Sequence, residues 1–141
     1  MAVRVKLRIK VAGRQLEVVA LVNSGFETDE PQLLVPDRLL TVNDISIAGL
    51  KGSVIEYGTP AGPISLYVAK RCCSVLVVEP DRRSKEVTVD LVISPTEREV
   101  LISDALGEEL GIVILSMKKG IWRFNDDPWE MSRSSYPPQY W

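Results

Sequence analysis

The sequence predicts an all-β fold that is closed or nearly closed, with one short helix near its C-terminal end. Residues 3–11 alternate strictly between apolar and basic side chains, and this period of two indicates a half-buried strand. Short apolar runs separated by turn residues then recur along the chain, which is typical of small barrels and sandwiches. A capped helical pattern appears late in the chain, at residues 103–111.

The first strand is predicted to belong to an antiparallel hairpin. Residues 16–22 form a second, more apolar strand, and the turn residues 12–14 join the two. Residues 36–40 are expected to form one helical turn. Further strands are expected at residues 32–35, 45–48, 53–57, 64–69, 74–78 and 86–93.

The predicted helix follows the short apolar run Val100-Leu101-Ile102. Ser103 can accept a hydrogen bond from a free backbone N–H of the first turn, and Asp104 is favoured there by the helix dipole. Gly111 is expected to end the helix, because glycine readily adopts the left-handed conformation of a helix C-terminus. Residues 112–124 then form a last hairpin.

Two segments of different character are expected. Residues 1–124 form one domain, and residues 125–141 form a polar, proline-rich tail without strand or helix periodicity. The tail is either flexible or laid on the surface of the domain through its aromatic residues. These residues are Trp129, Tyr136, Tyr140 and Trp141.

Composition excludes several kinds of function. The chain of 141 residues has a net charge of −2, so general attraction to nucleic acid or to an anionic membrane is not expected. It contains no histidine, which removes Ser–His–Asp and Cys–His catalysis and histidine-based zinc sites. No apolar run is long enough to cross a bilayer, and the N-terminus does not resemble a signal peptide, so a cytoplasmic protein is expected.

The segment Leu21-Val22-Asn23-Ser24-Gly25 carries the functional prediction, because here an apolar strand ends in a small polar triplet closed by glycine. It resembles the signature of the retroviral-type (retropepsin-like) aspartic proteases, and especially of their single-domain cellular and archaeal relatives. That signature is two apolar residues followed by Asp-Thr/Ser-Gly, and only Asn23 departs from it. The run at residues 100–106 resembles the apolar run and helix that the family has near its C-terminus, although Ser103 replaces the usual glycine.

The resemblance, which covers residues 1–124, implies a retropepsin-like half-barrel that works as a homodimer and cleaves peptides or proteins without a cofactor or metal. Two carboxylates, one from each chain, would share a proton, so that one acts as base and the other as acid. The hairpin of residues 53–69, with its glycine- and proline-rich tip, would be the flap over the substrate.

The resemblance also assigns roles to single residues. Ser24 would bond across the dimer, and Gly25 would let the substrate backbone approach closely. Glu27 would lie near the substrate main chain. Tyr57, beside Gly58 at the flap tip, would either bond in the cleft or be an ordinary exposed strand aromatic.

Asn23 leaves the activity open. An asparagine can form hydrogen bonds, but it cannot exchange a proton at neutral pH, so the chain as written should be inactive as a protease. The change is either an introduced or recent loss in an aspartic endopeptidase, or a natural feature of a non-catalytic dimeric module that binds peptides or proteins. Two further readings are an unrelated small β-barrel and an ordinary turn at Asn23-Ser24-Gly25.

Overall fold

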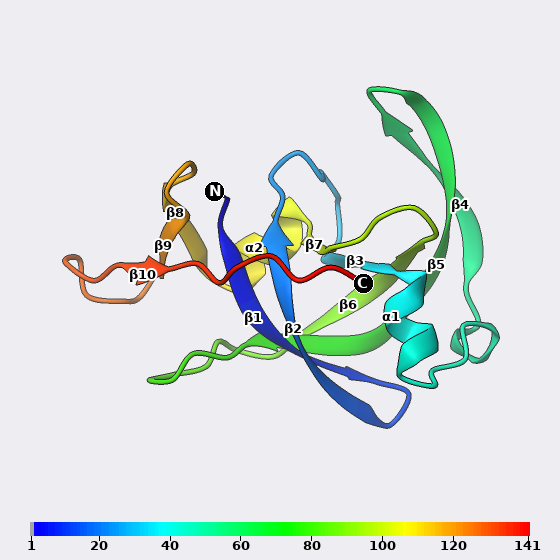
Figure 1. Cartoon of the computed structure of the whole chain (residues 1–141), viewed down its shortest axis with the longest axis horizontal. Helices are drawn as coiled ribbons and strands as arrows, with labels where there is room; N and C mark the ends of the chain where they lie inside the picture. The colour runs from blue at the N-terminus through cyan, green and yellow to red at the C-terminus, as the bar shows by residue number, and fades with distance from the viewer. Residues whose placement is uncertain (1) are drawn as a thin grey trace.

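The computed structural model describes residues 2–141, and its central feature is a closed β-barrel (Figure 1). Six strands make the barrel, in the order β1-β2-β7-β3-β6-β5, and β5 closes it by pairing with β1. The predicted all-β class is therefore confirmed. The six strands are β1 (Arg4–Val11), β2 (Arg14–Val22), β3 (Gln32–Pro36), β5 (Gly62–Val77), β6 (Val87–Ser94) and β7 (Val100–Ile102).

Strand β5 closes the barrel, and it can do so because it is long enough to pair with different neighbours along its two halves. Its first half pairs with β4 (Ser53–Thr59) and β6, and its second half pairs with β6 and β1. A bulge between Ala69 and Cys73, where Arg71 has φ +48°, bends the strand between these halves. The prediction of two separate strands at residues 64–69 and 74–78 was wrong, because the polar residues at the bulge interrupt the alternation without ending the strand.

The barrel interior is filled by alternate residues of its strands. The five apolar residues of residues 3–11 all point inward, as the alternation predicted. Burial of this kind contributes roughly 25 cal/mol for each Å² of apolar surface removed from water. Trp122 and Phe124, from the second sheet, close one end of the interior with their rings in an edge contact 5.0 Å apart.

The outer face of β3, β6 and β7 is also apolar, which is unusual for a barrel wall. Leu34, Val92 and Leu101 point outward there and pack against Leu66 and Val68 of β5. The β4–β5 hairpin rises from this face, on the right of Figure 1. These three strands are therefore buried on both faces, and their outer face forms the floor of a cleft.

Two short helices lie at the edges of the barrel. The predicted C-terminal helix is confirmed as α2 (Asp104–Glu109), with the Ser103 hydroxyl accepting the backbone N–H of Leu106 at 3.2 Å. The predicted turn after β3 is α1 (Asp37–Val42). The strand expected at residues 45–48 is absent from the described structure: Ile45 donates its N–H to Leu40 of α1, and the chain continues into a 3-10 turn, Ala48–Leu50.

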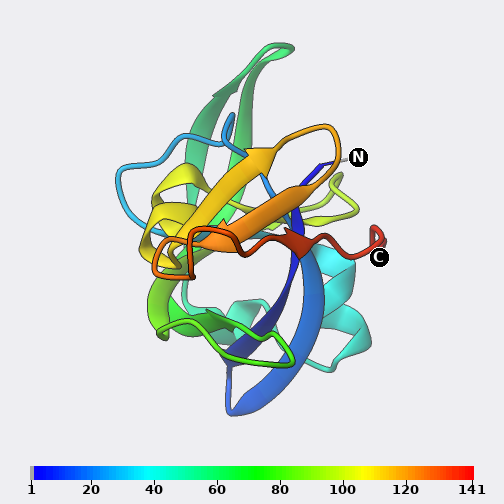
Figure 2. The ribbon, with the colours of Figure 1, turned by 90° about the vertical axis from the view of Figure 1, so that its left-hand side faces the viewer.

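The tail packs on the barrel in the structure. It supplies β10 (Arg133–Ser134) to a three-stranded sheet with β8 (Ile112–Ser116) and β9 (Ile121–Phe124), as Figure 2 shows. Beyond β10 the chain runs along β1 and β2, where the Gln139 side chain accepts the N–H of Val19 at 2.8 Å. Of the four expected aromatic anchors, Tyr136 and Trp141 are half-buried, whereas Trp129 and Tyr140 are 86% and 57% exposed. No helix within residues 2–141 has the length and apolar character needed to span a membrane.

Candidate active site

The loop after β2 presents Asn23 at the end of a barrel strand. Its backbone N–H donates to the carbonyl of Ile102 at 3.1 Å, which fixes the loop to β7. Phe26 donates its N–H back to the Asn23 carbonyl at 3.0 Å, so residues 23–26 form a tight turn. The Asn23 side-chain oxygen accepts the N–H of Gly25 at 3.0 Å. A Cβ at Gly25 would lie 3.3 Å from that oxygen, which explains why glycine suits this position.

Asn23 and Gly25 line a cavity of about 280 Å³ between this loop, the β4–β5 hairpin and the loop after β6. Its floor is the apolar outer face of the barrel, through Leu34 and Leu101. Its other lining residues are Phe26, Tyr57, Gly58, Thr59, Pro60, Ile64, Leu66, Ser94, Thr96 and Glu97. The structure thus places the predicted residues Asn23, Gly25, Tyr57 and Gly58 around one space.

Tyr57 is the point at which the hairpin touches the barrel. Its hydroxyl donates to the side-chain oxygen of Gln32 at 2.9 Å, and its ring meets Phe26 edge-on at a centroid distance of 6.4 Å. Burial raises the pKa of Tyr57 above its ordinary value, so the hydroxyl keeps its proton and remains a donor at neutral pH. Tyr57 is therefore half-buried in the site rather than an exposed strand aromatic.

A second, larger cavity of about 650 Å³ lies on the other side of Tyr57, and Glu27 lines it. Five carboxylates surround this cavity, with Lys70 as its one basic residue among those described. The carboxylates belong to Glu27, Asp29, Glu30, Asp90 and Asp104. Asp104 also anchors the loop, because it accepts the N–H of Thr28 at 2.9 Å. Glu27 thus lies beside the Asn23 cavity and not in it.

Ser24 is exposed and, unlike the other predicted site residues, lines neither of these two cavities. Its hydroxyl forms no hydrogen bond with any residue between 2 and 141. A bond from Ser24 to a second chain remains a prediction.

Sequence reasoning missed two buried polar residues that are bonded to the candidate site. Gln32 and Asp90 are 8% and 4% exposed, and the Gln32 side-chain nitrogen donates to Asp90 at 3.4 Å. Asp90 also accepts the backbone N–H of Arg71 at the β5 bulge, at 2.9 Å. Together they connect Tyr57 to the barrel wall. One signal was visible: Asp90 is a single charge within an otherwise apolar strand, and such a charge is rarely buried without a partner.

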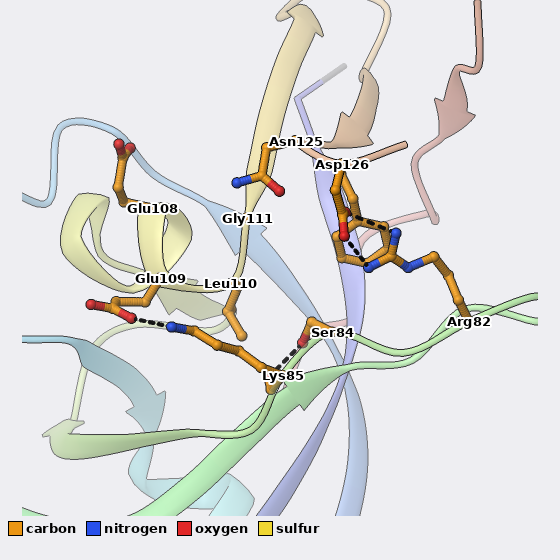
Figure 3. Close-up of a pocket in the computed structure, with 10 residues that line it drawn as sticks. Arg82, Ser84, Lys85, Glu108, Glu109, Leu110, Gly111, Asn125 and Asp126 are labelled. Carbon is orange, nitrogen blue, oxygen red and sulfur yellow. Dashed lines mark hydrogen bonds and ion pairs between the residues drawn. The ribbon is translucent and has the colours of Figure 1, made fainter. Parts of the chain in front are cut away.

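A third cavity, of about 400 Å³, lies between the end of α2, the loop after β5 and the end of β9 (Figure 3). Four of its charged groups form two ion pairs: Arg82 binds Asp126 at 2.9 Å, and Lys85 binds Glu109 at 2.8 Å. It holds none of the predicted site residues. Within residues 2–141, no group of three or more histidine, cysteine or acidic side chains is arranged to hold a metal ion.

Comparison with known proteins leaves the identity of this site open. No protein-family model matches the chain. No curated protein matches it in sequence either. The chemistry of the Asn23 cavity is therefore inferred from its geometry alone. That geometry provides hydrogen-bonding groups, an apolar floor and a covering hairpin, but Asn23 itself supplies neither a general base nor a general acid.

Proposed function

We propose that this chain is one half of a homodimeric, retropepsin-like aspartic endopeptidase whose chemistry is switched off by Asn23. The observation that carries the proposal is the position of Asn23. It lies at the end of a barrel strand, in a glycine-closed turn, on a cavity covered by a hairpin with Tyr57 and Gly58. An aspartate there would accept the same hydrogen bond from Gly25 and present its other oxygen to a bound peptide.

The proposed reaction needs two such loops. Two facing carboxylates cannot both ionise, so one would remove a proton from water while the other protonates the departing amine. Each chain supplies one triplet, and the second must come from a second copy related by a two-fold axis. In the chain as written, both positions carry an amide, and the loss of acid–base catalysis costs about 10²–10⁴-fold or more.

The second sheet offers a surface for this dimer. Strand β8 is an edge strand that is apolar on both faces, and Leu115 and Met117 are 48% and 74% exposed. Soluble proteins protect such edges, because an exposed apolar edge pairs with other strands. The β8–β9 tip, the loop after β2 and the β4–β5 hairpin all extend toward the upper side of the molecule in Figure 1. We therefore place the proposed interface on that side.

Replacing Asn23 with aspartate tests the proposal directly. Asn23→Asp should cleave peptides between about pH 3 and about pH 7, where one carboxylate of a shared-proton pair is ionised. A statine-type inhibitor such as pepstatin should block the cleavage. The peptide pool should include basic side chains, because the neighbouring cavity is acidic.

Asn125→Asp is the matched control, since it makes the same chemical change at an asparagine outside the Asn23 cavity. It should leave the chain without activity. If Asn23→Asp forms a folded dimer and cleaves nothing across this pH range, the endopeptidase proposal fails.

The second candidate is a dimeric module of the same fold that binds extended peptides without cutting them. It is favoured by the amide of Asn23, which completes the turn without supplying a proton donor or acceptor for catalysis. Peptide affinity would then be equal for the chain and for Asn23→Asp, with no turnover by either. Isothermal titration with the same peptide pool distinguishes the two candidates.

A further inference from the structure

The turn at Asn23 combines three features that favour a reaction of its own side chain. The Asn23 side-chain oxygen accepts the N–H of Gly25 at 3.0 Å, which polarises the amide carbonyl. The backbone N–H of Ser24 donates to no acceptor among residues 2–141. Ser24 and Gly25 are both exposed, so water reaches the turn.

We propose that Asn23 is a self-modifying site, at which the backbone nitrogen of Ser24 attacks the side-chain amide and water then leaves an aspartate in its place. Conversion of the Asn23 amide to a carboxylate depends only on this turn. The consequence of that conversion, formation of a catalytic pair of carboxylates, rests on the proposed function. The chain would thus be a precursor whose catalytic residue forms after folding.

The steps balance without an oxidant or a cofactor. Ser24 N–H loses its proton to water, and the nitrogen forms a bond to Cγ of Asn23. The negative charge that develops on the side-chain oxygen lies against the Gly25 N–H, in the manner of an oxyanion hole. The side-chain nitrogen takes up a proton and leaves as ammonia, and a cyclic imide remains.

Hydrolysis of the imide restores an open chain. Water adds at Cγ and breaks its bond to the Ser24 nitrogen, which recovers its proton and leaves a carboxylate on residue 23. The net change is one water consumed and one ammonia released. Addition at the backbone carbonyl instead gives an isoaspartate linkage, which displaces the carboxylate from the cavity.

The other two asparagines of the chain lack this combination. After Asn43, the N–H of Asp44 donates to the carbonyl of Thr41 at 3.1 Å, so that nitrogen is engaged. The Asn125 side-chain oxygen accepts no hydrogen bond from the described residues, so its amide is not polarised in this way. Both are internal controls in the same molecule, exposed to the same solution conditions.

In the experiment, the purified full chain is incubated at neutral pH in water enriched in heavy oxygen. Peptide mapping with mass spectrometry then follows the three asparagines over time. Asn23 should become aspartate, with heavy oxygen incorporated, at least about tenfold faster than Asn43 and Asn125, because one well-placed donor to a developing oxyanion is worth about 10²–10³-fold. Equal rates at all three positions, an unchanged Asn23, or isoaspartate as its sole product would overturn the inference.

Two variants test the role of the Ser24 nitrogen. Ser24→Pro removes the N–H, and proline is favoured at the second position of a turn, so the fold should persist while conversion stops. Ser24→Ile keeps the N–H but crowds it, and it should slow conversion. Conversion at the original rate in either folded variant would contradict attack by this nitrogen.

The outcome can be separated from that of the proposed function. Conversion of Asn23 without peptide cleavage would support the modification and reject the protease. Cleavage by Asn23→Asp in a protein whose Asn23 never converts would support the protease and reject the modification. If both hold, peptide cleavage by the incubated chain should rise in proportion to the aspartate formed.

Discussion

Replacing Arg133 with methionine tests how much its ion pairs stabilise the fold. Arg133 joins the tail to the loop after β5 by pairing with Asp81 and Glu79, and it also pairs with Asp127 of the tail itself. Its guanidinium donates to Asp127 at 2.9 Å and to Asp81 at 2.7 Å. The side chains of Arg133 and Asp127 are only 8% and 2% exposed. The guanidinium carbon lies 5.1 Å from the centre of the Phe124 ring. Methionine is an unbranched apolar side chain that removes the charge.

The expected loss of unfolding free energy depends on the hydrogen bonds that Asp127 keeps when Arg133 is replaced. Breaking a buried pair by removing one partner costs about 3–5 kcal/mol, because the remaining charge stays buried. Asp127 would still accept the Phe124 N–H at 2.8 Å and Arg82 at 3.3 Å. We therefore expect a loss near the lower limit, about 3 kcal/mol. For a chain of this size that loss lowers the melting temperature by roughly 6–12 °C.

Chemical unfolding followed by tryptophan fluorescence measures the change. Arg123→Met is the matched control: its guanidinium contacts backbone carbonyls of Phe124 and Asn125 but no carboxylate, so it should cost less than about 1 kcal/mol. A loss for Arg133→Met as small as for the control would refute the reasoning, since it would mean that the ion pairs merely offset their own desolvation.

The pH dependence gives a second check. The hydrogen bonds from Arg133, chiefly, hold the pKa of Asp127 at about 2, below its ordinary value of 3.8. A lowered folded-state pKa stabilises the fold above the unfolded pKa, and this contribution is lost as the pH falls through the folded value. The difference between the chain and Arg133→Met should therefore be constant down to about pH 4 and shrink toward about pH 2.

Three further changes test other parts of the structure. Tyr57→Phe removes the hydrogen bond to Gln32. Hydrogen exchange of the backbone amides in the β4–β5 hairpin should become faster, and the unfolding free energy should fall by about 1 kcal/mol. Unchanged exchange would mean that this bond does not hold the hairpin on the barrel. Leu115→Asp should shift the proposed dimer to monomer in analytical ultracentrifugation, whereas Val42→Asp, at an exposed position of α1, should not. Equal behaviour of the two variants would place the interface elsewhere. Ser103→Ala should cost about 1–2 kcal/mol by thermal unfolding, because it removes a buried helix cap, and a neutral result would contradict that role.

Much of the fold was predictable because its signals are local. The alternation of residues 3–11 placed β1 and its inward face correctly, and Ser103 and Gly111 placed both ends of α2. The triplet at Asn23 was predictable as a turn after a strand. Each of these signals depends on neighbours within a few residues, so the sequence carries it without knowledge of the fold.

The attachment of the tail to the rest of the molecule could not be predicted from such local signals. Its attachment depends on Arg133, Asp127 and Asp81, and charged residues in a polar segment predict solvent exposure as readily as burial. The same holds for Asp90, whose partners come from β3 and from the bulge in β5. Sequence reasoning could identify these charged residues as unusual, but it could not predict which residues they bind.

Local patterns in the sequence were enough to predict the all-β class, the capped helix and the turn at Asn23 that follows β2. Tertiary structure alone decided that Tyr57 meets Gln32 and Phe26, that two cavities flank this contact, and that the tail is fixed to the barrel. The physical reason is closure of the barrel. Pairing of β1 with β5 joins segments more than sixty residues apart, and no local pattern of side chains encodes which distant groups that closure brings together.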